Sequence, residues 1–250
     1  MKIIISPAKT IKISDDYALE MTSPIFGDKT KDIMDYIKSL SYDEAKLMWK
    51  CNDKIATLNF DRFKEMDLKQ NINPALFAYE GLQYQYISAK TLEKSDLEYL
   101  EKNLRILSGF YGVLRPSTAI TPYRLEMQAL INYKEYTNLY DYWGESLVDE
   151  LIKDGDKLIL NLASKEYSKC ISKYEKEKDI SILTINFCEF KDGKLKQKAT
   201  LAKIARGEFV RSLAVRKIKN IEEIKKLKIL DFEYAEGFST KEEFTYIKIV

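Results

Sequence analysis

Arginine is the residue whose distribution most suggests chemistry in this chain. Only seven of the 41 basic residues are arginine, and six of these fall in two stretches, 105–124 and 206–216. Guanidinium is planar, permanently charged and bidentate, so it suits phosphate and carboxylate recognition. No Asp or Glu occurs between Asn103 and Leu125, so the first stretch has no acidic neighbour in sequence. We interpret the two stretches as an anion-binding surface; the alternative is structural pairing of each arginine with a carboxylate.

The absence of histidine excludes several kinds of site. A chain of 250 residues without histidine has no Ser-His-Asp triad, no Cys-His dyad and no His-ligated zinc. Cys51, Cys170 and Cys188 are isolated, with no Cys-x-x-Cys spacing, which fits buried thiols in a reducing cytosol. We therefore expect neither a metal nor a cofactor. Acid–base catalysis would fall to Glu126, Glu166, a Lys or a Tyr.

The overall charge and hydropathy restrict the kinds of partner that we expect this protein to bind. The formal net charge is only +2, so a nucleic-acid partner would need a local basic patch. No apolar run approaches membrane-spanning length, and the N-terminal apolar run is too short for a signal sequence. We expect a soluble cytoplasmic protein with no membrane partner, and the oligomeric state stays open.

Two polar segments follow apolar runs that are typical of buried strands. Residues 3–5 and 157–162 predict such strands, and they lead into Ser6-Pro7-Ala8-Lys9-Thr10 and residues 163–167. Ligands gather at the carboxyl ends of strands in α/β sheets, so we expect the two segments to meet there. Lys9 and Thr10 could hold a phosphate; the alternative is a turn with a solvated lysine.

The remaining candidates lie near the two arginine stretches. Gly109-x-x-Gly112 could bring backbone N–H groups near a phosphate, with Arg115 and Arg124 close by and Glu126 as an orienting carboxylate. A predicted basic helix over 202–218 places Lys203 and Arg206 on one face, followed by Arg211. The alternative for this helix is a solvated basic surface.

The fold predicted from these patterns is a mixed α/β (α+β) domain over 1–250, with a central mixed sheet flanked by helices. Helical spacing appears over 28–40 and 43–50, with Ser41 and Glu44 as a capping box, and 52–66 predicts a further helix pair. Helices are also predicted over 92–107, 140–153 and 220–228. An Asp-Gly turn predicts a hairpin over 181–201, and a last strand is predicted over 244–250.

Six blocks together resemble the YaaA peroxide-stress protein family: SPAKT, RILSGFYGVLRP, PYRLEM, LYDYWG, NLASKEY and AKIARG. They occur in the family's order and span nearly the whole chain. The resemblance implies a cytoplasmic bacterial protein with a compact fold peculiar to the family. It also implies a role in hydrogen peroxide stress and iron homeostasis, in which lower free iron limits oxidative damage.

The resemblance further implies binding of double-stranded DNA through a basic cleft and a helix-hairpin-helix element. Such an element would correspond to residues 43–64, although this segment contains no glycine, whereas such hairpins usually carry Gly-hydrophobic-Gly. Carried onto this sequence, the matching blocks give these residues around the cleft: Lys9, Thr10, Arg115, Arg124, Lys165, Lys203, Arg206 and Arg211.

Two other functions compete with DNA binding. The polar residues of the two strand-ending segments also fit an enzyme that acts on a small anionic, nucleotide-like ligand, with catalytic residues that the sequence does not identify. Iron sequestration is disfavoured, because the chain has no histidine, no cysteine cluster and no Glu-x-x-His pattern.

Overall fold

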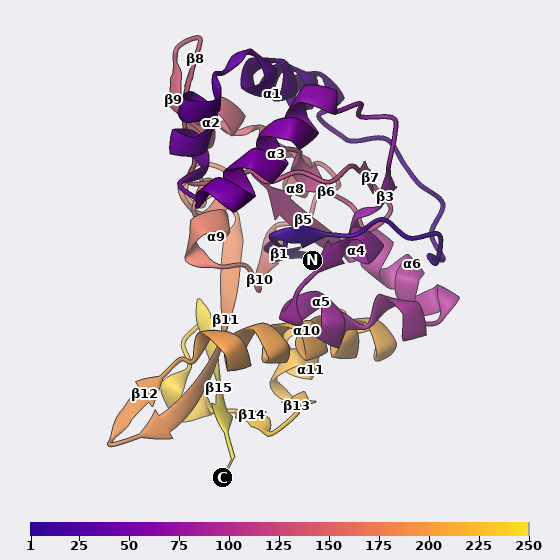
Figure 1. The fold of residues 1–250 in the computed structure, drawn as a ribbon. Coiled ribbons are helices and arrows are strands. Elements are labelled where there is room, and N and C mark those ends of the chain that lie inside the picture. Colours follow the sequence, from indigo (N-terminus) through magenta and orange to yellow (C-terminus); the bar gives the residue numbers. More distant parts are fainter. Residues whose placement is uncertain (250) are drawn as a thin grey trace.

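A large mixed sheet organises the chain (Figure 1). A computed structural model describes residues 1–249. The strands of the sheet are β1 Lys2–Ile5, β5 Leu104–Ser108, β6 Gly112–Leu114, β10 Leu158–Asn161, β11 Ser181–Lys191, β12 Lys194–Lys196, β13 Lys228–Ile229, β14 Phe232–Tyr234 and β15 Glu243–Lys248. Within the described residues these nine strands lie in the order β13-β14-β15-β11-β10-β1-β5-β6, with β12 paired to β11. The predicted fold class is therefore confirmed.

The centre of the sheet is parallel and buried. β1 lies between β10 and β5 and is parallel to both, and β11 is parallel to β10 and to β15. Ile3, Ile4 and Ile5 are completely buried, as expected for a strand with helices or loops on both faces. Lys2 is also buried, and its ammonium group forms an ion pair with Asp154 over 2.9 Å. The apolar run at the N-terminus thus forms the core of the sheet.

The helices gather in two parts of the molecule, with β11 running from one to the other (Figure 1). They are α1 Gly27–Ser39, α2 Tyr42–Trp49, α3 Asp53–Glu65, α4 Ala75–Ala78, α5 Leu82–Ile87, α6 Lys94–Asn103, α7 Leu139–Trp143, α8 Ser146–Ile152, α9 Lys165–Ser172, α10 Ala199–Val215 and α11 Ile221–Lys225. The helices α1, α2 and α3 lie in the upper part of the view, and α10 and α11 lie in the lower part beside α5.

Three short antiparallel pairs complete the fold. β2 (Thr10–Ile11) pairs with β4 (Tyr79–Glu80), β3 (Asn73–Pro74) with β7 (Ala119–Ile120), and β8 (Leu130–Tyr133) with β9 (Tyr136–Asn138). The β2–β4 pair holds the segment after β1 against the segment that leads into α5. Two segments distant in sequence are thereby brought to the same side of the sheet.

Local signals predicted several elements correctly. The Ser41 hydroxyl accepts a bond from the Glu44 backbone N–H, and the Glu44 carboxylate accepts one from the Ser41 backbone N–H. The predicted capping box at the start of α2 is therefore confirmed. Asp192 and Gly193 both have positive φ, at 55° and 72°, as a tight hairpin turn requires. The last strand is confirmed over Glu243–Lys248, while Val250 lies outside the described residues.

Other predicted elements were wrong. The helix expected over 92–107 ends at Asn103, and Leu104–Ser108 forms β5 instead, because these residues are buried beside β1 in the sheet. The helix expected over 140–153 is two helices, α7 and α8, which part at Gly144, where φ is 53°. The helix pair expected over 52–66 is the single helix α3. Tertiary burial overrides helical spacing in the first case.

Candidate anion-binding site

The segments that follow β1 and β10 meet at the carboxyl ends of these strands. The Ser164 backbone N–H donates to Ser6 Oγ over 2.8 Å, and Ser6 Oγ donates to Ser164 Oγ over 3.3 Å. The hydroxyl of Tyr84, on α5, donates to the Ser6 carbonyl over 2.9 Å. This meeting was predicted from the sequence and is confirmed. It follows from the parallel register, in which Ile4 lies opposite Asn161 so that both strands end at one edge.

A cavity of about 430 Å³ lies at this junction. Its volume is within the range of small-molecule sites, roughly 300–1,000 Å³. The walls come from the segments after β1 and β10, the 123–126 loop, the end of β4, and the helices α5, α9 and α10. The lining residues are 6–10, 80–84, 123–126, Ser164, Glu166, Tyr167, Lys203 and Arg206. Of the eight predicted site residues, Lys9, Thr10, Arg124, Lys203 and Arg206 line this cavity.

Arg124 and Lys9 share one carboxylate. Glu126 Oε1 accepts from Arg124 Nη2 over 2.9 Å and lies 3.3 Å from Lys9 Nζ. Glu126 is only 15% exposed, whereas Lys9 is 69% exposed. The charge of the carboxylate is therefore balanced within the cavity wall, and Glu126 orients Arg124 as the sequence suggested.

Gly109 holds the Arg124–Glu126 segment in place. A Cβ atom at this position would lie 2.6 Å from the Leu125 carbonyl oxygen, closer than real contacts allow. The carbonyl of Gly109 also accepts a bond from Trp143 Nε1 over 3.0 Å. The glycine thus permits a close backbone approach between the β5–β6 turn and the cavity wall, rather than supplying N–H groups to a ligand.

Lys203 and Arg206 bring unpaired positive charge into the cavity from α10. Burial lowers the pKa of the Arg206 guanidinium from its ordinary value. Its Nε is buried without a hydrogen-bond partner, a property that it shares with the Nε atoms of three other arginines. What distinguishes Arg206 and Lys203 from Arg124 is that no acidic side chain in residues 1–249 forms an ion pair with them. Buried charges are normally paired, because desolvation is costly. An unpaired guanidinium in a cavity wall therefore indicates a site for an anion.

Glu80 and Glu166 also line the cavity, and Glu166 differs from Glu126 in its surroundings. It lies in the first turn of α9 and accepts a bond from the Gln128 backbone N–H over 3.3 Å. Burial raises the pKa of Glu166, and the negative charge of Glu126 acts in the same direction, while Gln128 and Lys9 act against them. The cavity thus holds one carboxylate that is ion-paired, Glu126, and one whose pKa is raised mainly by burial, Glu166.

Tyrosines form the apolar part of the wall. The Tyr123 hydroxyl is 2.6 Å from the Tyr79 hydroxyl and 2.6 Å from Ser108 Oγ, and burial raises the pKa of Tyr123 to about 12. Burial also holds the pKa values of Tyr84 and Tyr167 well above their ordinary value. All three cavity tyrosines are therefore neutral near pH 7 and present aromatic surface or hydroxyl groups.

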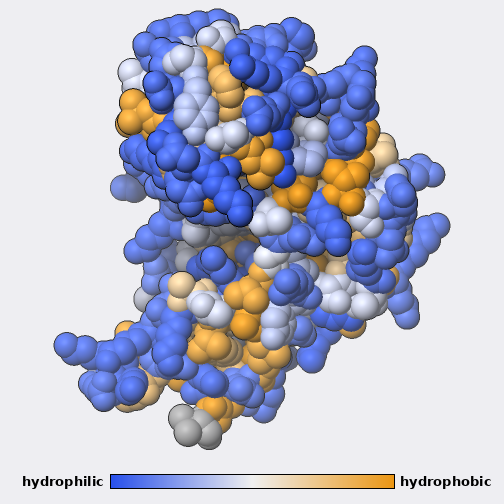
Figure 2. All heavy atoms as spheres, in the orientation of Figure 1, coloured by the Kyte–Doolittle hydropathy of each residue, from blue (hydrophilic) through white to orange (hydrophobic). Residues whose placement is uncertain are grey.

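A second cavity, of about 720 Å³, adjoins the first along α10 and α9. Ser164, Lys203 and Arg206 line both cavities, and Lys165 lines the second one only. Figure 2 shows a recess on this face of the molecule between its upper and lower parts. The unpaired cations therefore lie at the junction of two hollows and not within a closed core.

The other predicted arginines do not reach either cavity lining. Arg115 lies 4.0 Å from Glu150, on α8. Arg211 donates to the carbonyl oxygens of Ile87 and Ser88 over 3.2 and 3.3 Å, and so caps the C-terminal end of α5. Arg105 is buried and donates to backbone carbonyls. The two arginine stretches thus converge only through Arg124 and Arg206.

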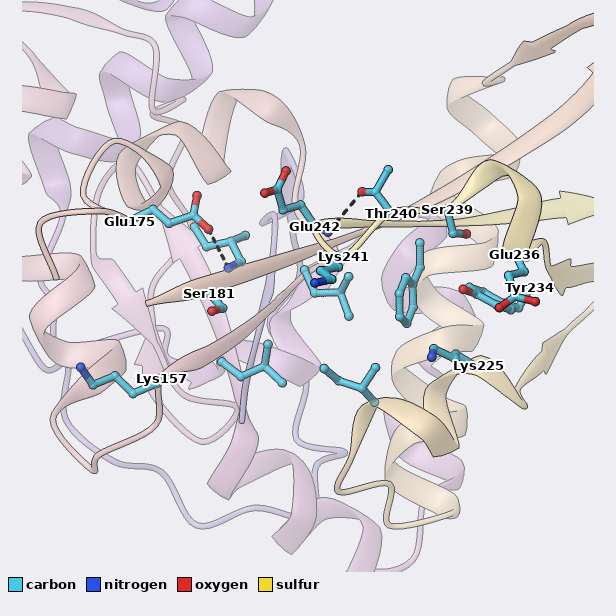
Figure 3. Close-up of a pocket in the computed structure, with 15 residues that line it drawn as sticks. Lys157, Glu175, Ser181, Lys225, Tyr234, Glu236, Ser239, Thr240, Lys241 and Glu242 are labelled. Carbon is cyan, nitrogen blue, oxygen red and sulfur yellow. Dashed lines mark hydrogen bonds between the residues drawn. The ribbon is translucent and has the colours of Figure 1, made fainter. Parts of the chain in front are cut away.

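A third cavity lies elsewhere and contains none of the predicted site residues. It has a volume of about 860 Å³ and is lined by β11, α11 and the segment before β15. Figure 3 shows lysines and glutamates of this cavity spread around its rim, with Glu175 bonded to the Ile182 backbone. Its polar groups do not converge on one point, so it is a weaker candidate.

Sequence reasoning missed the contribution of residues 80–84. Gln83 and Tyr84 line the cavity, and both are buried. No local pattern marks them, because their position depends on the packing of α5 against α10 and on the β2–β4 pair. Of the aromatic residues singled out in the sequence, Tyr123 lines the cavity, whereas Tyr140, Tyr142 and Trp143 do not.

Comparison with known proteins places nearly the whole chain in one family. The family model described as "Peroxide stress protein YaaA" matches residues 1–237. The chain belongs to the YaaA peroxide stress protein family. A "UPF0246 protein" from Lachnoclostridium phytofermentans is 47% identical over 248 residues, covering 99% of this chain and 96% of that protein. One from Agathobacter rectalis is 46% identical over 246 residues, covering 98% of each.

Membership of the YaaA family does not confirm the helix-hairpin-helix element. Residues 43–64 fall in α2 and α3, which are joined by the turn Lys50-Cys51-Asn52. Lys50 has a φ of 46°, and Asp53 forms an ion pair with Lys46. This acidic partner occupies the amino end of α3, where a phosphate would otherwise bind.

Two kinds of feature are missing from residues 1–249, a membrane-spanning helix and a metal-binding cluster. Among residues 1–249, no helix is both long and apolar enough to cross a membrane. In the same part of the chain, no group of three or more His, Cys, Asp or Glu side chains is placed to hold a metal ion.

Proposed function

We propose that this protein acts in the peroxide stress response by binding double-stranded DNA without sequence preference and so helps to limit iron-driven damage. The observation that carries the proposal is the unpaired guanidinium of Arg206, beside Lys203, at the junction of two cavities. Phosphate contacts dominate non-specific DNA affinity. The YaaA family match supports the link to peroxide stress.

The duplex would lie across the mouth of the smaller cavity and not inside it. A cavity of about 430 Å³ is too small for a duplex, because a B-DNA duplex is wider than its own major groove, which is already about 12 Å wide. The β11–β12 hairpin projects from the lower part of the molecule (Figure 1), and Gln197, just beyond it, lines the second cavity. Its exposed Lys191 and Lys194 add positive charge next to the turn of the hairpin. A two-stranded ribbon of this kind fits a DNA groove.

The test is a salt series with a labelled duplex. Affinity should fall steeply as salt rises, and Arg206→Ala should weaken binding to all sequences about equally. Arg216→Ala is a matched control, since Arg216 is an exposed arginine just past the end of the same helix. Equal losses in the two variants, or no binding by the unaltered protein at low salt, would reject the proposal.

The link to peroxide is tested in cells. A strain without the protein should survive peroxide less well, and an iron chelator should restore its survival. The unaltered gene should complement the strain, whereas the Arg206→Ala form should not. Complementation by Arg206→Ala would separate the stress role from this site.

A second candidate function is an enzyme that acts on a small anionic ligand in the same cavity. The observation that favours it is the presence of two carboxyl groups in different surroundings, the ion-paired Glu126 and the half-buried Glu166, inside a cavity of small-molecule size. A thermal-shift screen of nucleotides tests this candidate, because a bound ligand stabilises the folded state. A small anion that both stabilises the protein and competes with DNA would favour it over simple DNA binding.

A further inference from the structure

The charges of the smaller cavity are divided between two sides. Lys203, Arg206 and Ser164 lie on the side shared with the neighbouring cavity. The carboxylates of Glu80, Glu126 and Glu166 line the smaller cavity only. Lys9 and Arg124 lie on that side as well, where both pair with Glu126. The cavity therefore has a purely cationic side near α10 and a carboxyl side near the start of α9 and the 123–126 segment, on which three carboxylates outnumber two cations.

The carboxyl side has hydrogen-bond acceptors to spare. Glu126 is ion-paired with Arg124 and Lys9, but each of its oxygens can accept more than one bond. Glu166 accepts a backbone bond and has no cation within 4 Å among the described residues. Hydroxyl or amino groups of a ligand would satisfy these acceptors, whereas a second anionic group would be repelled.

The cationic side has donors to spare. Arg206 and Lys203 have no carboxylate partner within residues 1–249, and the Nε of Arg206 lacks any hydrogen-bond partner. Ser164 caps α9 without a side-chain bond to that helix, and its hydroxyl accepts from Ser6. A phosphate group matches this set of two cations and a hydroxyl.

We propose that the smaller cavity binds one phosphate monoester of nucleotide size, with its phosphate at Arg206 and Lys203 and its hydroxyl or amino donors at Glu126 and Glu166. Tyr84, Tyr123 and Tyr167 would line the space between these two sides. This deepens the second candidate function, on which it rests. The same chemistry is offered by a free nucleotide or by one nucleotide turned out of a DNA duplex.

The orientation distinguishes this site from a generic phosphate site. Inorganic phosphate satisfies only the cationic side, and a nucleoside satisfies only the carboxyl side. A nucleoside 5′-monophosphate reaches both, so it should bind at least about 10-fold more tightly than either part, one charge-assisted hydrogen bond being worth about that factor.

The experiment is titration calorimetry with inorganic phosphate, nucleosides, and the ribo- and deoxyribonucleoside 5′-monophosphates. We expect at least one monophosphate to bind at least about 10-fold more tightly than inorganic phosphate or the matching nucleoside. Arg206→Ala should weaken its binding about 10- to 100-fold and leave nucleoside binding unchanged. Glu126→Gln and Glu166→Gln should reduce the advantage over inorganic phosphate, and Arg216→Ala should change nothing. If no monophosphate binds more tightly than inorganic phosphate, the inference is overturned.

The source of the nucleotide is decided by competition. A duplex with one unpaired nucleotide that displaces the monophosphate more strongly than a fully paired duplex identifies DNA as the source. If only free monophosphates compete, the ligand is a free nucleotide. Should Arg206→Ala lose duplex affinity while every monophosphate binds no better than phosphate, the inference fails and DNA binding stands. If Arg206→Ala instead loses monophosphate binding and keeps its duplex affinity, the inference stands and DNA binding at this site is rejected.

Discussion

Gly207 sets the distance between α10, which carries Arg206, and α5, which carries Tyr84. A Cβ atom at position 207 would lie 2.2 Å from the Gln83 carbonyl oxygen and 2.8 Å from Tyr86 Cβ. Ordinary contact begins near 3.4 Å, so Gly207→Ala requires the helices to separate by about 1.2 Å, the difference of these distances. Because the nearest atom belongs to the backbone, it cannot move aside as a side chain would.

The magnitude follows from two opposing terms. Overpacking of this kind costs about 1–3 kcal/mol, and a backbone clash favours the upper end. Replacing glycine by alanine inside a helix contributes about 1 kcal/mol of stability. We therefore expect Gly207→Ala to lower the free energy of unfolding by about 2 kcal/mol. For a chain of this size the melting temperature should fall by about 4–8 °C.

Urea unfolding followed by circular dichroism measures this change. The matched control is Gly27→Ala at the start of α1, where an added Cβ meets no atom within 4 Å, and it should change stability by less than about 0.5 kcal/mol. The separated helices should also weaken anion binding, since Arg206 moves with α10. If Gly207→Ala is as stable as the unaltered protein, the close packing of α5 and α10 is refuted.

Three further predictions concern the cavity and its surroundings. Burial raises the pKa of Glu166, so ionisation of this side chain costs the folded protein stability. Glu166→Gln should therefore be more stable than the unaltered protein above the folded-state pKa, and this difference should vanish as the pH falls below the ordinary value of 4.5. Urea unfolding at a series of pH values measures the difference. A constant difference at all pH values would contradict this cause. Tyr123→Phe removes the hydroxyl that bonds to Ser108 Oγ and should cost about 1–3 kcal/mol in the same assay, whereas a loss below about 0.5 kcal/mol would show that the buried partners rearrange. Lys191→Gln with Lys194→Gln should reduce the slope of log affinity against log salt for duplex DNA by up to about 2, and an unchanged slope would exclude the hairpin from the interface.

The structure explains why some elements followed from local sequence. The Ile3–Ile5 run has no polar residue to place at a surface, so it forms a strand buried on both faces. Ser41 with Glu44, and Asp192 with Gly193, encode their cap and turn through bonds or φ values within a few residues. Such features need no information from the rest of the chain. The meeting of the loops after β1 and β10 also followed, since parallel neighbours end at the same edge.

The fate of the arginines, by contrast, followed only partly from local sequence. Arg105 and Arg124 lie in one stretch with no acidic residue between them, and Glu126 follows Arg124 by two residues. One is buried in β5 and bonds to backbone carbonyls, while the other joins Glu126 in the cavity wall. Along α10, Arg211 caps α5, and Arg206 is left without a partner. Arg105 and Arg124 thus bond to groups near in sequence, whereas the partners of Arg211 come from a distant segment.

The sequence by itself therefore determined the buried strands β1 and β10, the edge where their loops meet, and the family, but not the buried strand β5. The tertiary structure alone decided which cations face the cavity, because that depends on the crossing of α10 over α5 at Gly207 and on the close approach of the 124–126 segment at Gly109. Both sites are close approaches between segments that are distant in sequence, and local hydrophobic patterns do not predict such contacts.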